Sequence, residues 1–126
     1  MTHFSRISGV VIDVPTSDHD RELAFGEAAI GQSLPEFDYP EYHGGQLRGQ
    51  DFWLLIQRLD DGAARVHVDI HTDNLDAEVE RLEHLGAQRV HRAHSWWVLR
   101  DPVGLLFCVI PDPGSTVNDN NAHRWE

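Results

Sequence analysis

The part of the sequence that most constrains the fold is residues 64–90, ARVHVDIHTDNLDAEVERLEHLGAQRV. Apolar and polar residues alternate over 65–71, which is the pattern of a half-buried strand. Apolar residues then recur at helical spacing, with Asp73 as the expected N-cap and Gly86 as the expected left-handed residue after the helix. A second strand pattern follows Gly86. We therefore predict a strand, a helix and a strand in immediate succession.

The two faces of the first predicted strand differ in chemistry. Its apolar residues are expected to pack against the helix, which leaves its polar residues on the opposite face, free to line a site. The apolar face consists of Val66, Val68 and Ile70, and the polar face carries His67, Asp69 and His71. The acidic residues of the predicted helix are expected to form a solvated surface; they are Asp76, Glu78, Glu80 and Glu83.

The first half of the sequence repeats this unit faintly. RISGVVIDVPTSD aligns with ARVHVDIHTDN so that Gly9 falls opposite His67, and a helix is predicted from about residue 17 or 18 to Ile30. Strand patterns follow each helix, at 36–39, 46–48 and 52–58 in the first half and at 87–92, 96–100 and 105–110 in the second. The segment PEFDYPEYHGG, residues 35–45, is rich in Pro and Gly and is expected to be mainly loop. The pattern indicates an α+β protein with a duplicated βαβββ module.

The composition excludes several classes of function. Lys and Arg total 10 against 21 Asp and Glu, a formal net charge of -11, so the electrostatic footprint of a nucleic-acid or anionic-membrane protein is absent. The single cysteine, Cys108, rules out an internal disulfide and is typical of a reducing compartment. The start, MTHFSRISGV, has no leader-like apolar region, and no apolar run is long enough to span a membrane. We therefore expect a cytoplasmic protein that binds neither nucleic acid nor membrane.

Two copies of β-α-β-β-β, with His67 opening the second copy and a D-P-x-G turn at 101–104 before its last strand, resemble the vicinal oxygen chelate superfamily. The closest resemblance is to its short glyoxalase-like proteins and covers roughly residues 5–111. It implies one domain at 1–111, with modules at about 5–60 and 63–111. After Pro111 the sequence loses its periodicity, so we expect a C-terminal tail at 112–126 that is ordered only if Trp125 docks. In that superfamily the two modules curl a mixed sheet into a cup, and members commonly form homodimers.

The resemblance also implies where a metal would bind. Enzymes of the superfamily, such as glyoxalase I and extradiol dioxygenases, bind a divalent metal with residues from the first and last strand of each module. Those positions fall on Gly9, Gln57, His67 and Cys108 here. Only His67 is kept as a strong ligand, because glycine has no donor and an amide oxygen is a weak one. Relatives such as the bleomycin-resistance proteins use the cup for a ligand without metal.

We expect a small-molecule-binding protein whose cup takes a hydrophobic or aromatic metabolite or drug, with a degenerate metal site and no required cofactor. His67 is its main polar anchor and, if the protein is an enzyme, its catalytic residue. The ligand-binding residues expected from strand alternation and from the aromatic content are Trp53, Leu55, Gln57, His67, Asp69, Trp97, Leu106 and Cys108. The tryptophans are equally well explained as core residues.

Three alternatives stay open. In the first, His67, Gln57 and Cys108 hold a zinc-like divalent ion in a metal-dependent lyase, isomerase or dioxygenase. In the second, Cys108 is a nucleophile with His67 as its base, although its apolar neighbours disfavour a thiolate. In the third, the chain is an accessory module that acts through a dimer surface. The residues therefore leave open whether this protein is an enzyme.

Overall fold

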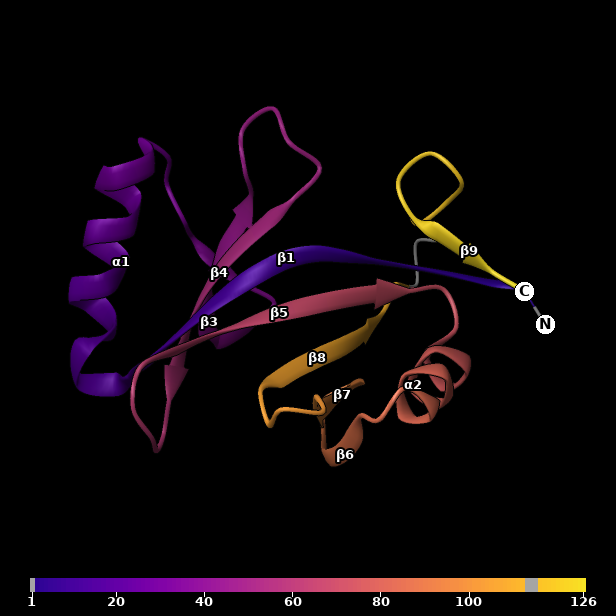
Figure 1. Cartoon of the computed structure of the whole chain (residues 1–126). Helices are drawn as coiled ribbons and strands as arrows, with labels where there is room; N and C mark the ends of the chain where they lie inside the picture. Colours follow the sequence, from indigo (N-terminus) through magenta and orange to yellow (C-terminus); the bar gives the residue numbers. More distant parts are fainter. Residues whose placement is uncertain (1, 113–115) are drawn as a thin grey trace. The chain divides into compact units, whose positions relative to one another are not determined.

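The computed structural model describes residues 2–112 and 116–126, so residues 113–115 of the expected tail lie outside the described residues. The elements follow one another as β1 (His3–Pro15), α1 (Thr16–Ile30), β2 (Glu36–Phe37), β3 (Tyr39–Gln46), β4 (Trp53–Leu59), β5 (Arg65–Thr72), α2 (Leu75–His84), β6 (Gln88–Ala93), β7 (Trp96–Arg100), β8 (Leu106–Pro111) and β9 (His123–Trp125). The predicted βαβββ order therefore occurs twice, and the α+β class is confirmed (Figure 1).

The strands form a mixed sheet that is not closed. Its order is β2-β3-β4-β1-β5-β8-β7-β6, with β9 paired to β1 outside this path. The first and last long strands of each module pair in parallel, β1 with β4 and β5 with β8, and the remaining pairs within each module are antiparallel. The chain divides into two compact units, Gly9–His67 and the remainder, and both β1 and β5 contribute residues to each.

In the unit Gly9–His67, α1 packs on β1 and β4 (Figure 1). The core consists of Val14, Leu34 and Ile56. The helix ends as predicted at Ile30, because Gly31 takes the left-handed conformation with φ of 67°. The expected loop at 35–45 is wrong, since most of it is strand β3. Gly44 explains the difference: it pairs with Leu55 of β4 so closely that any larger side chain would meet the β4 backbone.

In the other unit, α2 packs on β8 and β7 through Val79, Leu99 and Val109, which are all fully buried. The N-cap is Asn74 rather than Asp73: the Asn74 side chain accepts a hydrogen bond from the Ala77 backbone N–H. Asp73 has a different partner, because its carboxylate accepts a hydrogen bond from the Phe4 backbone N–H at 2.8 Å. Of the helices that the structure describes, none is long and apolar enough to cross a membrane.

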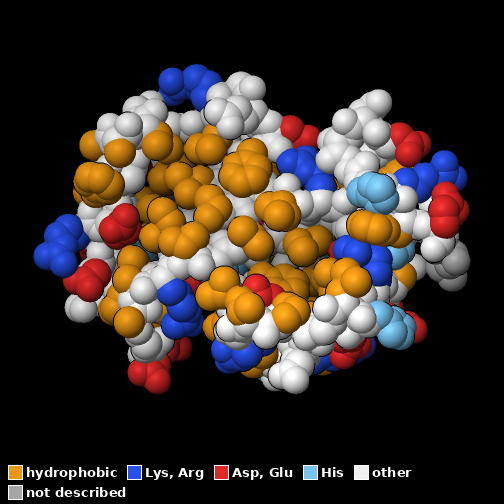
Figure 2. Space-filling model, viewed as in Figure 1, with side chains coloured by type: hydrophobic (Ala, Val, Ile, Leu, Met, Phe, Trp, Pro, Cys, Tyr) orange, Lys and Arg blue, Asp and Glu red, His pale blue; other side chains and the backbone are white. Residues whose placement is uncertain are grey.

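The expected faces of β5 are only partly correct. Ile70 packs against the α2 core as predicted, but Val66 and Val68 are 62% and 36% exposed. Hydrophobic side chains also gather on the face of the molecule that Figure 2 shows. The polar face is the buried one: Asp69 is only 5% exposed. Ile70 is covered because it packs against the core cluster that includes Val79 of α2.

Glu78 of α2 is fully buried, which corrects the expectation of a solvated acidic face. It lies 2.8 Å from His3 Nε2 and accepts two hydrogen bonds from the Arg81 guanidinium. Burial alone would raise the pKa of Glu78, but the hydrogen bonds from Arg81, His3 and Ser5 outweigh burial and hold the pKa below its ordinary value. The spacing of charges on α2 did not show that one carboxylate has buried partners on β1.

The end of the chain is held by Trp125. Its indole N–H donates to Ser5 Oγ at 2.9 Å, and the Arg81 guanidinium lies over its ring at 3.7 Å from the centroid. Strand β9 pairs antiparallel with β1 over His3–Ser5. Trp125 therefore docks on the rest of the chain, which was the condition for an ordered tail that we expected from the sequence.

Candidate functional site

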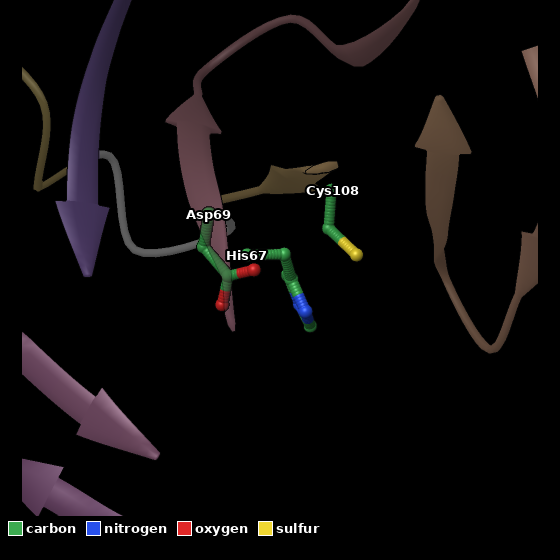
Figure 3. A group of neighbouring side chains, drawn as sticks. All are labelled: His67, Asp69 and Cys108. Atoms are coloured by element: carbon green, nitrogen blue, oxygen red, sulfur yellow. The ribbon is translucent and has the colours of Figure 1, made fainter. Parts of the chain in front are cut away.

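The polar face of β5 and the facing residue of β8 bring three metal-ligating side chains together. Asp69 lies directly opposite Cys108 in the parallel register, and His67 precedes Asp69 on the same face of the strand. One donor atom from each of His67, Asp69 and Cys108 lies within 4.8 Å of the others. Figure 3 shows the three side chains extending to the same side of these strands. We call this group the β5–β8 cluster.

All members of the β5–β8 cluster are shielded from solvent. Asp69 and Cys108 are 5% and 8% exposed, and the His67 side chain is 10% exposed. Low solvent exposure strengthens electrostatic interactions and makes an uncompensated charge costly. A cluster of this kind is therefore suited to an ion or to a strongly polar group of a ligand.

Asp13 is a member of the site that the sequence did not single out. Asp13 Oδ2 lies 2.5 Å from His67 Nδ1, and Asp13 is only 1% exposed. Because a carboxylate only accepts, His67 Nδ1 donates this hydrogen bond, and in the neutral ring the lone pair then lies on Nε2. Arg65 Nε lies 3.9 Å from the same oxygen. The alternation of β1 placed Asp13 on the correct face, but nothing in the sequence paired it with His67.

Within the described part of the chain, Asp13 Oδ1 is a buried oxygen without a hydrogen-bond partner. Gln57, one of the expected metal ligands, lies directly opposite Asp13 in the β1–β4 register. Its amide is therefore placed beside the Asp13 and His67 pair, on the face of the sheet away from α1.

Gly9, the remaining position implied by the superfamily, cannot hold any ligand. It lies opposite Trp53 in the β1–β4 register, and a Cβ at this position would lie 2.7 Å from the Trp53 carbonyl oxygen. Such a contact is shorter than real Cβ atoms make. The spacing between the backbones of β1 and β4 therefore excludes a side-chain ligand at position 9.

The other expected ligand-binding residues fall into two groups. Trp53 contacts Phe37 at 5.0 Å between ring centroids, and Leu55 lies opposite Val11, both on the face away from α1. Trp97 instead pairs with Val109 and packs on the α2 core, with the Arg89 guanidinium 4.9 Å from its ring centroid. Cys108 faces the other way, so the structure does not bring Trp97 to the β5–β8 cluster. Leu106 shares the face of Cys108 on β8.

The donor set of the cluster fits a divalent metal. Imidazole nitrogen, carboxylate oxygen and thiolate sulfur are all ligands of zinc, and three protein ligands with a further open position are the usual content of a catalytic zinc site. A hydrogen bond from the non-ligating nitrogen of a histidine to a carboxylate commonly orients such a ligand, and Asp13 makes this contact with His67. The cluster contains Asp69 beside the predicted ligands His67 and Cys108, and the predicted ligand Gln57 lies opposite Asp13.

Comparison with known proteins identifies the family. The family model described as a glyoxalase-like domain matches residues 9–110, so the chain belongs to the glyoxalase-like family. This match confirms the resemblance to glyoxalase-like proteins that was drawn from the sequence. None of the curated proteins matches the sequence.

Three solved structures illustrate the shared fold. Methylmalonyl-CoA epimerase from Mycobacterium tuberculosis is 16% identical, with a TM-score of 0.61 over 86% of this chain and 89% of its own. The Mn(II)-bound glyoxalase from Novosphingobium aromaticivorans is 21% identical, with a TM-score of 0.64 over 89% of this chain and 40% of its own. The 2,2',3-trihydroxybiphenyl 1,2-dioxygenase from Sphingomonas wittichii strain RW1 is 13% identical, with a TM-score of 0.58 over 86% of this chain and 41% of its own. The chain therefore spans less than half the length of two of these proteins. At these sequence identities, the similarity to all three structures shows a shared fold and nothing more.

Proposed function

We propose that this protein binds a small organic molecule at the β5–β8 cluster, through a divalent metal ion held by His67, Asp69 and Cys108. The observation that carries the proposal is the convergence of one donor atom from each residue within 4.8 Å. Imidazole, carboxylate and thiolate together favour zinc or a similar borderline ion over magnesium or calcium. When bound, such an ion supplies Lewis acidity toward a carbonyl, enol or phenol oxygen of the ligand.

The chain's own residues have distinct tasks in this proposal. Asp13 accepts a hydrogen bond from His67 Nδ1 and so fixes the imidazole ring, which makes Asp13 a positioning residue. The partly exposed Leu106, which shares the face of Cys108 on β8, supplies apolar surface for the carbon skeleton of the ligand. The proposed ligand is therefore small and hydrophobic or aromatic, with one oxygen able to reach the metal.

A second candidate function is binding of the same class of ligand without metal. It is favoured by Gly9, whose contact with the β4 backbone leaves no room for a ligating side chain at this position, and by Gln57, whose amide is a weak ligand. In that case His67 is the polar anchor, and a hydrogen bond to the ligand replaces the metal bond. Asp13 would again hold the imidazole, and the pair could also remove a proton as a general base.

The experiment that separates the two candidates is elemental analysis of protein purified without chelator. The comparison uses the wild type, His67→Ala, and His91→Ala, in which an exposed histidine of β6 is removed as a matched control. Near-stoichiometric metal in the wild type and in the control, with loss in His67→Ala, supports the metal site. Metal-free wild type that still binds a planar probe such as catechol, and loses this binding in His67→Ala, supports the second candidate.

We also propose that the protein forms a homodimer. Two points support a homodimer: members of the superfamily commonly form homodimers, and the apolar residues Ile7, Val66 and Val68 are exposed. Light scattering during size-exclusion chromatography tests it directly. A monomer at all concentrations would exclude a stable dimer and leave the proposal for the β5–β8 cluster unchanged.

A further inference from the structure

Two histidines of module one face each other outside the β5–β8 cluster. His19 lies on α1 and is fully buried, whereas His43 on β3 is partly buried. Their ring centroids are 4.9 Å apart and their planes make an angle of 55°. His43 lies opposite Ile56 in the β3–β4 register, and Ile56 belongs to the core beneath α1, so β3 directs His43 toward the helix.

Each of the two rings has one buried nitrogen that lacks a hydrogen-bond partner among the residues that the structure describes. In the described residues, His19 Nε2 and His43 Nδ1 are both buried nitrogens without a hydrogen-bond partner. An unpaired buried polar atom destabilises a fold, so two in a pair of touching rings are uncommon. A third group bound by both nitrogens would satisfy them.

The surroundings of His19 define what that group can be. Its Nδ1 lies 3.3 Å from Asp20 Oδ1, which also accepts a hydrogen bond from Arg58 at 3.3 Å. Since the carboxylate only accepts, Nδ1 of the neutral ring carries the proton and Nε2 carries the lone pair. Burial lowers the pKa of His19 from its ordinary value, against the effect of Asp20, and so favours the neutral ring. A neutral imidazole backed by a carboxylate is the usual form of a metal-ligating histidine.

We propose that His19 Nε2 and His43 Nδ1 hold a divalent ion of the zinc, copper or nickel class, with water or a small anion completing its coordination. These are the ions that imidazole ligands favour. The carboxylate of Asp20 lies behind His19 and offsets part of the added positive charge. The site belongs to α1 and β3 of one module and shares no residue with the β5–β8 cluster.

The first test is zinc titration of metal-free protein by calorimetry, in a His67→Ala background that disables the β5–β8 cluster. Adding His43→Gln should remove one zinc equivalent, whereas adding His91→Gln, at an exposed histidine, should leave the stoichiometry unchanged. Circular dichroism checks that each variant is folded. Equal zinc uptake in all three proteins would overturn the proposal.

The second test needs no substitution and therefore does not depend on how the variants fold. Long-range ¹H–¹⁵N spectra of the wild type report the protonation and ligation of each imidazole nitrogen. Zinc should shift the signals of His19 Nε2 and His43 Nδ1 together, from a starting state in which His19 carries its proton on Nδ1. If only other histidines respond, a buried water or a direct contact between the rings satisfies the two nitrogens, and the metal site is refuted.

Discussion

Replacing Gly9 by alanine tests the spacing between β1 and β4 on which the interpretation of module one rests. The added Cβ would lie 2.7 Å from the Trp53 carbonyl oxygen and 3.0 Å from Trp53 Cβ. Ordinary van der Waals contact begins at 3.4 Å. The Trp53 carbonyl is part of the backbone of a paired strand, so relief requires β1 and β4 to separate locally.

The magnitude follows from two opposing terms. Overpacking of this kind lowers the free energy of unfolding by about 1–3 kcal/mol. Alanine also restricts the unfolded chain more than glycine does, which raises the free energy of unfolding by about 0.4–1 kcal/mol. We expect a net loss of about 1–2 kcal/mol, or roughly 3–10 °C in Tm for a chain of this length. The matched control is Gly45→Ala on β3, where a Cβ meets nothing within 4 Å, and which should be neutral or stabilised by up to about 1 kcal/mol.

Urea denaturation followed by fluorescence measures both variants, and an unchanged m-value shows that the comparison is of folded-state stability. If Gly9→Ala is as stable as Gly45→Ala, the contact with Trp53 is not rigid and the reasoning is refuted. The same contact predicts that Gly9→His will not restore the metal ligand that the superfamily enzymes carry at this position. That variant should lose stability without gaining affinity for zinc.

Three further predictions concern other parts of the fold and the site. Leu99→Ala should destabilise the protein by about 2–5 kcal/mol in urea, because Leu99 is fully buried, whereas Leu105→Ala, at 65% exposure, should change stability by less than about 0.5 kcal/mol. The pKa of Glu78 is lowered in the folded state, so its contribution to stability should be complete above pH 4.5 and be lost as the pH falls through the lowered pKa. Glu78→Gln should cost about 1.5–3 kcal/mol near neutral pH and should reduce the loss of stability at acid pH. An unchanged loss of stability at acid pH would contradict the role given to Glu78. Asp13→Asn should keep the fold but weaken metal binding at His67 by about 10–100-fold in calorimetry, and unaltered affinity would show that Asp13 does not position that ring.

The elements of the fold were largely predictable, because each depends on local patterns. The alternation of β5 and the glycine after α1 define their elements without reference to the rest of the chain. Strand β3 was not predictable, since its Pro and Gly residues resemble a loop and only its pairing with β4 makes it a strand. The buried state of Glu78 escaped prediction for the same reason, because its partners come from outside α2.

The site was predictable only where one strand carries it. His67 and Asp69 were expected on one face of β5, and the resemblance placed Cys108 with them. Asp13 required the long-range register that sets it against His67, although its place among apolar residues in β1 was a usable signal. His19 likewise lies four residues before Leu23 on the apolar side of α1, and this spacing could have marked it as buried.

Strand β9 has a consequence for self-association. Strand β4 pairs with β1 over Gly9–Pro15, and β9 pairs with β1 over His3–Ser5. Exposed backbone N–H and C=O groups on a strand edge are templates on which other chains add strands, and they promote aggregation. The short β9, held by Trp125, therefore acts as an edge protector, and its loss is expected to reduce solubility before it reduces the stability of either unit.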